Sequence, residues 1–468
     1  MKRTTLCSAV VCVISTPLVG QQSDSKPAAG PRVVQVTIHP AAEPRPALKY
    51  LLLPDFVDQV PGNAAPRYFT ASLLIPDDSK ELSKEQFRSW AQLPLEDLPR
   101  EKARQVLGGY RDALREAELG AFREVCDWEY PIRSEGFSLL LPGLARQRAL
   151  ARALALRARL NTAEGRCDEA LRDLQMGFAM ARHTGESPLL ISGLVGIAIG
   201  DVMKAQVETL IGRPDCPNLY WALTNLPRPF VDIRKALAGE RAWLLFSSPA
   251  CRDPRKVRFT AQQWDQLFLD AMTLMDHERK QSEADKKLLA DWVARVYPKA
   301  KQYLLDQGMA SKAVEAMPEK QAILVYLMDH YHITKDDYFK WLALEYWQAH
   351  EGLARAEKAA EQLKHDDAEL IAATMLPSLT RAYYLYNRLD QGIAALRCIE
   401  AIRMYAANHD GKLPTSLADI TEVPIPIDPI TGKAFRYKLE AGMGVLECPP
   451  PPGALAKNGT RYELTIPR

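Results

Sequence analysis

The densest group of potential metal ligands lies well past the middle of the chain, where Asp329, His330 and His332 are close neighbours and Glu345 follows further on. A strand would present both histidines on one face, whereas a helix would point them about 200° apart. The surrounding pattern predicts a helix end, so the simpler interpretation is that the histidines cap a helix terminus. We therefore expect no metal, and a site built from His330, His332 and Glu345 is the alternative.

Other catalytic patterns are incomplete. His350 and Glu351 match the start of the HExxH zinc motif, but Ala354 stands where the second histidine belongs. Thr431, Gly432 and Lys433 lack the upstream glycine and the following hydroxyl of a phosphate loop, and no GxSxG elbow occurs. The sequence therefore predicts no cofactor, and it singles out no catalytic residue.

The chain has eight cysteines, of which Cys7 and Cys12 lie in the first 20 residues. The other six form no CxxC pair and have no histidine at zinc-ligand spacing beside them. Cys398 is expected on an apolar helix face, and Cys448 at the end of a strand that packs against that helix. These positions should bring the two thiols close together, which allows either a disulfide between Cys398 and Cys448 or two free buried thiols that satisfy the same packing.

The first 20 residues have the layout of a secretory signal peptide, because Lys2 and Arg3 precede an apolar run that ends near Gly20. The protein is therefore expected to be exported, to the periplasm or the extracellular space. The 60 Lys and Arg residues balance 58 Asp and Glu residues, which leaves no charge surplus for binding nucleic acid. No later apolar run reaches the roughly 20 residues of a membrane helix, so no transmembrane segment is expected after signal cleavage.

The rest of the chain is organised around residues 144–212, whose apolar spacing predicts three helices joined by turns. Leu171 and Leu174 should face the preceding helix. The glycines at 193, 196 and 200 predict close helix packing, because glycine in a helix costs roughly 1 kcal/mol and is usually tolerated where a neighbour needs the space. A solvated helix face is expected for a stripe of five arginines: Arg146, Arg148, Arg152, Arg157 and Arg159.

The predicted fold class is mainly α, an irregular array of solenoid-like helix pairs with a small carboxy-terminal α+β module. The expected domain order is a signal peptide (1–20), a disordered tether (21–31), an extended or short-strand segment packed on the helices (32–82), the helical array (83–389), and a helix with a small antiparallel sheet (390–468). In that last module, residues 434–439, 444–448 and 461–466 are predicted to form a meander, with a turn at residues 440–443.

Residues 158–183 resemble half of a tetratricopeptide unit. Gly165 lies at the turn between the helices, and the run from Asp168 to Leu171 matches the start of that family's second helix. Asn161 occupies the family's aromatic position in the first helix, and no 34-residue period continues elsewhere.

Residues 390–468 are similar to the globular half of type II secretion pseudopilins, in which a helix leads through a Gly-Pro turn into a small antiparallel sheet. No methylated amino-terminal membrane helix precedes the module, so the resemblance does not extend to pilus assembly. The matching positions are Gly411, Pro414, Leu417, Asp428, Pro429, Gly432, Phe435 and Tyr437.

Most of the chain resembles a group of uncharacterised secreted proteins from planctomycete bacteria. The segments that carry this resemblance are residues 1–20, 47–69, 163–183, 218–241 and 428–437. The resemblance implies export and supplies no activity. The expected function is that of an exported, non-enzymatic protein, an interaction or envelope-associated scaffold whose partner is another protein of the cell envelope. The alternative is a hydrolase or metal-dependent enzyme whose site is assembled from residues distant in sequence.

Overall fold

The computed structural model describes residues 30–76, 82–135, 139, 141, 143–275, 283–363, 370–452 and 454–467. The fold is mainly α with a carboxy-terminal α+β part, as the sequence predicts. The predicted signal peptide and nearly all of the predicted tether lie outside the described residues.

The chain divides into two compact units, and the division falls inside α11 (Arg234–Ser247) and α18 (Leu370–Asn408). The smaller unit contains Glu129–Leu140 and Ala238–Arg381. Its other helices are α6 (Ile132–Glu135), α12 (Pro249–Arg252), α13 (Ala261–Met275), α14 (Glu283–Asp306), α15 (Ser311–Glu315), α16 (Glu319–Phe339), η3 (Trp341–Ala343) and α17 (Tyr346–Leu363).

Local signals explain where helices of the smaller unit begin. Thr260 caps α13 in a reciprocal capping box, because its hydroxyl accepts from the amide of Gln263 and its own amide donates to the Gln263 side chain. Leu304 of α14 and Val325 of α16 belong to one buried apolar cluster, which joins these two helices.

The larger unit contains the rest of the described chain. Its helices and 3₁₀ turns are η1 (Phe56–Asp58), α2 (Ala65–Leu73), α3 (Lys84–Gln92), α4 (Arg100–Gly109), α5 (Arg111–Ala121), α7 (Gly143–Ala163), α8 (Cys167–Gly185), α9 (Leu190–Ile211), α10 (Tyr220–Thr224), η4 (Leu417–Asp419) and η5 (Ala456–Asn458). Its strands are β1 (Arg32–Thr37), β2 (Val60–Asn63), β3 (Arg123–Val125), β4 (Ile427–Asp428), β5 (Lys433–Ala434), β6 (Arg436–Glu440), β7 (Met443–Cys448) and β8 (Thr460–Thr465).

The three predicted helices of the central array are α7, α8 and α9, which pack on one another. Gly165 has a φ of +73°, which a residue without a Cβ adopts at little cost, and it forms the turn that reverses the chain between α7 and α8. Leu171 and Leu174 are only 5% and 1% exposed, so their predicted burial is confirmed.

Replacing Leu171 with Ala should lower the free energy of unfolding by about 2–4 kcal/mol, because the change removes buried methyl groups and leaves a cavity between packed helices. Urea unfolding followed by circular dichroism measures this loss. Leu73 provides a matched control because its side chain is 85% exposed, so Leu73→Ala should change stability little. A loss below about 0.5 kcal/mol for Leu171→Ala would show that the buried face is assigned wrongly.

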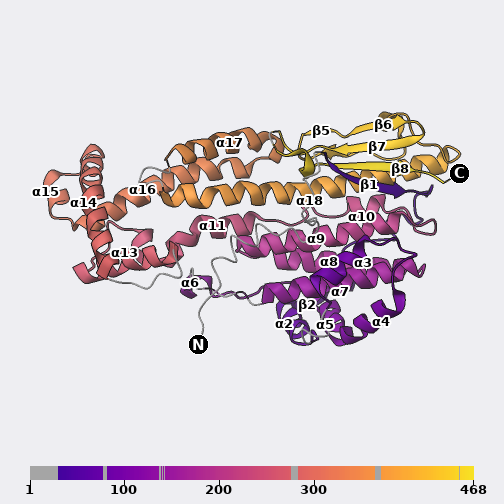
Figure 1. Cartoon of the computed structure of the whole chain (residues 1–468), viewed down its shortest axis with the longest axis horizontal. Coiled ribbons are helices and arrows are strands. Elements are labelled where there is room, and N and C mark those ends of the chain that lie inside the picture. The colour runs from indigo at the N-terminus through magenta and orange to yellow at the C-terminus, as the bar shows by residue number, and fades with distance from the viewer. Residues whose placement is uncertain are drawn as a thin grey trace. The chain divides into compact units, whose positions relative to one another are not determined.

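The carboxy-terminal sheet contains the predicted meander. β6 pairs antiparallel with β7, and β7 pairs antiparallel with β8. Ala441 and Gly442 both have positive φ, at 49° and 83°, as the tight turn between β6 and β7 requires. A fourth strand, which the sequence does not place, comes from the other end of the chain: β1 pairs parallel with β8, as Figure 1 shows where the indigo and yellow arrows lie side by side.

Two parts of the predicted domain order differ from the structure. The segment 32–82 is not extended throughout, because α2 is a helix that has Pro66 in its first turn and buries Tyr68 and Ala71. The expected boundary between residues 389 and 390 falls inside the continuous helix α18, where the isolated Gly392 does not end the helix. The carboxy-terminal module is therefore not a separate body in the structure.

One described helix, α9, is long and apolar enough to cross a membrane by length and composition. In its most apolar 18-residue window, 72% of the residues are buried inside the structure. Helices α7 and α8 pack on α9. A buried core helix has the same apolar composition as a membrane helix, so the composition of α9 fits either role.

Candidate functional site

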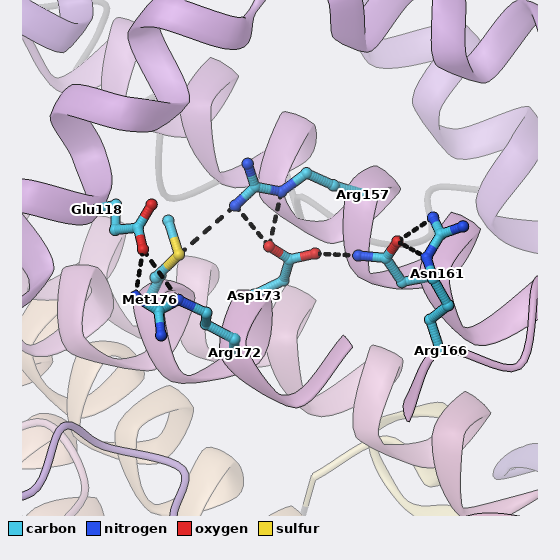
Figure 2. Close-up of polar contacts among 7 residues, drawn as sticks. All are labelled: Glu118, Arg157, Asn161, Arg166, Arg172, Asp173 and Met176. Carbon is cyan, nitrogen blue, oxygen red and sulfur yellow. Dashed lines mark hydrogen bonds and ion pairs between the residues drawn. The ribbon is translucent and has the colours of Figure 1, made fainter. Parts of the chain in front are cut away.

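A network of charged and polar side chains lies between α7 and α8 (Figure 2). Asp173 accepts hydrogen bonds from Arg157 Nε at 2.6 Å and from Asn161 Nδ2 at 2.8 Å, and the Asn161 carbonyl accepts from Arg166. Arg157 also contacts Met176 Sδ at 3.5 Å. The Asn161 side-chain amide therefore connects the Asp173 carboxylate with the Arg166 guanidinium.

The expectation of a solvated arginine stripe is wrong for most of its members. Arg146 is exposed, but Arg148, Arg152 and Arg157 are half-buried and Arg159 is buried. The cause is the position of α7, which packs against α2, α3, α4, α5, α8 and α9 and so has little solvent-facing surface. Burial lowers the pKa of Arg148 and of Arg159.

Burial raises the pKa of Asp173 to about 6, although Arg157 and Asn161 act to lower it. A carboxyl group whose pKa is higher in the folded state than in the unfolded state stabilises the fold at low pH. The contribution of Asp173 to the free energy of unfolding is therefore lost as pH rises from about 4 to about 6. Every polar atom of this carboxylate has a partner within the network, and the network is best explained as structural.

A second buried group surrounds His183 on α8. Tyr68 Oη lies 2.9 Å from His183 Nδ1, and Trp128 donates its indole N–H to the His183 carbonyl at 2.7 Å. The rings of Tyr68 and Trp128 stack with centroids 5.8 Å apart. Burial, and secondly the charge of Arg182, lower the pKa of His183 to about 4.

This low pKa predicts a pH dependence of folding. In the unfolded chain His183 titrates near 6.5, so the unfolded state binds more protons below that pH. The stability that His183 contributes should therefore be complete above pH 6.5 and fall by about 3 kcal/mol as pH drops to 4. Asp173 changes the stability in the opposite direction over the same pH range, so the wild type alone does not isolate the effect of His183. The measurement is therefore the difference in free energy of unfolding, from urea unfolding, between the wild type and His183→Gln across this range. The exposed His409 gives the control His409→Gln, and a difference that does not vary with pH would refute the assignment.

The residues of the alternative metal site do not share one environment. His330 and His332 lie in the interior of the helix α16, which continues to Phe339, so the predicted helix end and the capping role of the histidines are wrong. The His330 ring contacts the rings of Tyr303 and Tyr326, whereas His332 Nδ1 lies 3.1 Å from Lys335 Nζ, whose positive charge opposes a bound cation. Glu345 is exposed before α17. A site formed by His330, His332 and Glu345 therefore receives no support from the geometry.

The disulfide between Cys398 and Cys448 is absent, since both are free thiols in the structure. Both are buried, and burial raises the pKa of each. Cys398 is one of the groups that raise the pKa of Cys448. The helix and the strand that carry these thiols therefore lie close together, as expected. The packing is satisfied by two protonated thiols, which was the alternative expectation.

A pocket of about 340 Å³ lies in the larger unit, between residues 40–50 and 214–218. Its lining includes Arg45, Lys49, Asp215 and Cys216. Cys167, at the start of α8, lies next to it: the ligand atoms of Cys167, Asp215 and Cys216 all lie within 4.8 Å of one another. Sequence spacing gave no signal for this cluster, because about 50 residues separate the two cysteines and the fold alone brings them together.

The second pocket, of about 380 Å³, is lined mainly by apolar side chains, among them Leu48, Leu51 and Phe56. Leu48 and Phe56, which line this pocket, are exposed large apolar side chains, and so are Val57 and Val60, which follow Phe56 closely in the sequence. We call these four residues the apolar strap. Phe56 and Val57 are 79% and 83% exposed, and the exposed acids Asp55 and Asp58 flank them. The sequence identified these residues only as part of an extended segment.

The cysteine cluster and the apolar strap are thus the two features of the described residues whose geometry suits binding, and both belong to the larger unit. No family model, no curated protein and no solved structure matches the chain.

Proposed function

We propose that this is an exported, non-enzymatic protein that binds another protein of the cell envelope through the apolar strap. The observation that carries the proposal is the exposure of Phe56 and Val57 beside an apolar pocket. Contiguous exposed apolar side chains with a polar rim are typical of protein interaction sites. Burying one phenylalanine side chain contributes roughly 1.5–3 kcal/mol, so leaving this surface in water is unfavourable unless a partner covers it.

The chemistry of the surface suggests what the partner presents. A pocket of about 380 Å³ has room for a large apolar side chain, and Leu48, Leu51 and Phe56 form apolar walls for it. Asp55 lines this pocket, and the exposed Asp58 follows two residues after Phe56 in the sequence. The proposed ligand is therefore a short extended segment that carries a large apolar side chain flanked by Lys or Arg.

Site-specific photo-crosslinking tests this proposal. A photoreactive residue at Val57, introduced in the native cell, should crosslink to one envelope protein, and the additional change Phe56→Ser should abolish the product. The control places the same residue at Lys412, whose side chain is 76% exposed outside the apolar strap. Identical products from both positions, or none from Val57, would contradict the proposal.

Export is tested separately by mass spectrometry of the protein isolated from its native cell. Removal of a signal peptide should leave an amino terminus between residues 16 and 30, because the apolar run ends near Gly20. An intact Met1 on the cellular protein would refute export while leaving the interaction surface open to the crosslinking test.

A further inference from the structure

We infer that Cys167, Asp215 and Cys216 form a binding site for one thiophilic divalent metal ion of the zinc class. This inference is independent of the proposed function, because it concerns a different pocket and requires no partner protein. It also differs from the His330 alternative in residues, unit and ligand chemistry.

The distances suit a tetrahedral ion. With Zn–S bonds of about 2.3 Å and Zn–O bonds of about 2.0–2.2 Å, the ligand atoms of a tetrahedral site lie about 3.5–3.8 Å apart. The two sulfurs and a carboxylate oxygen of this cluster are all within 4.8 Å of one another. The Cys167 and Cys216 thiols are close enough to share a hydrogen bond. Binding therefore needs movements of about 1 Å or less.

The backbone holds these ligands in place before any ion binds. Cys167 is the first residue of α8, two residues after the positive-φ turn at Gly165. Pro214 and Pro217 bracket Asp215 and Cys216 and restrict the backbone of that loop. The three ligands thus come from one helix start and one proline-bracketed loop, and ordering them costs less entropy than ordering a flexible chain.

The surrounding charges favour an occupied site. Two thiolates and one carboxylate on a divalent ion give a complex with a net charge of about −1. Arg213 Nε lies 3.4 Å from Asp215 Oδ1, and Arg45 and Lys49 line the adjoining pocket. These cations would stabilise an anionic metal–thiolate complex.

The pocket also supplies an entry path and a fourth ligand. Asp215 and Cys216 line it directly, and the Asp215 side chain is 46% exposed. A water molecule from the pocket would complete four-coordination, since the described residues offer three converging ligands.

The protonation of the thiols gives the site a characteristic pH dependence. A thiol must lose its proton to ligate a metal ion, so binding releases protons from Cys167 and Cys216. The affinity of the site should therefore rise with pH.

Titration of the reduced, metal-free protein with Zn²⁺ or Cd²⁺ alone tests the site. We expect one equivalent to bind, with the thiolate-to-cadmium charge-transfer absorption of two sulfurs, and with the stated pH dependence. Cys167→Ser and Cys216→Ser should each lose this absorption. Asp215→Asn changes an exposed residue, so folding should be preserved, and it should weaken binding at least tenfold.

The double variant Cys398→Ser with Cys448→Ser is the matched control, because it removes the other neighbouring thiol pair and should bind as the wild type does. Three results would overturn the inference: no stoichiometric binding, equal binding by Cys167→Ser and the wild type, or a disulfide between Cys167 and Cys216 in the protein isolated from its native cell.

Discussion

Replacing Arg403 with Met should lower the free energy of unfolding by about 3–5 kcal/mol, because it leaves a buried charged partner without compensation. The Arg403 and Glu400 side chains are both fully buried, and Arg403 Nη1 donates to both Glu400 oxygens at 2.9 and 3.0 Å. The guanidinium also donates to the carbonyls of His39, Pro217 and Cys216. One side chain thus joins α18 to the segment after β1 and to the loop after α9. Urea unfolding measures the loss.

The same variant should acquire a pH dependence. Burial raises the pKa of Glu400, whereas Arg403 lowers it, so removing Arg403 raises it further. A carboxyl group with a raised folded pKa loses its favourable contribution as pH rises. The stability loss of Arg403→Met should therefore be larger at pH 8 than at pH 5. Lys256→Ala breaks the exposed ion pair with Asp253 and serves as the control, with no resolvable change in stability. A similarly small effect for Arg403→Met would contradict the account.

Replacing Gly196 with Ala should destabilise the larger unit by about 3 kcal/mol, because there is no room for a methyl group between α8 and α9. A Cβ at Gly196 would lie 2.5 Å from the Ala181 carbonyl oxygen and 2.6 Å from Gly185 Cα. These are backbone atoms, so the two helices would have to separate. The expected cost exceeds the gain of roughly 1 kcal/mol from the better helix propensity of alanine.

Gly193 on the same helix is the matched control. A Cβ there would meet Ile233 Cγ2 at 3.5 Å, which is an ordinary contact. Gly193→Ala should therefore keep or slightly raise stability through helix propensity. Thermal unfolding of both variants distinguishes the two positions, and equal destabilisation would show that close packing at Gly196 is not the reason for its glycine.

The parts of the fold that the sequence predicts are those with local signals. Gly165 marks the turn between α7 and α8, and the tight turn at Ala441 and Gly442 fixes the register of β6 against β7. The pairing of β1 with β8 could not be predicted in this way, because it joins segments more than 400 residues apart and neither strand carries a signal for its partner.

The candidate sites were less predictable than the fold. Arginines on α7 have the spacing of a solvated stripe, and only the packing of other helices around α7 determines that most of them are half-buried or buried. Likewise, Cys167 and Cys216 are too far apart in the sequence to form a motif. The chain reversal at Gly165 and the packing of α9 on α8 bring them together. The spacing of apolar residues in the sequence indicates which face of a helix or strand is apolar, but it does not indicate which other helices or strands will cover that face.

The proposal that the apolar strap is a binding surface is tested most directly by the dissociation constant between the purified mature chain and the envelope protein that crosslinks to Val57. Phe56→Ser should weaken binding by about 10- to 100-fold, since burying a phenylalanine contributes roughly 1.5–3 kcal/mol and 1.4 kcal/mol corresponds to a factor of ten. Lys412→Ser should leave the constant unchanged. The same dissociation constant for the wild type and for Phe56→Ser would contradict the proposal.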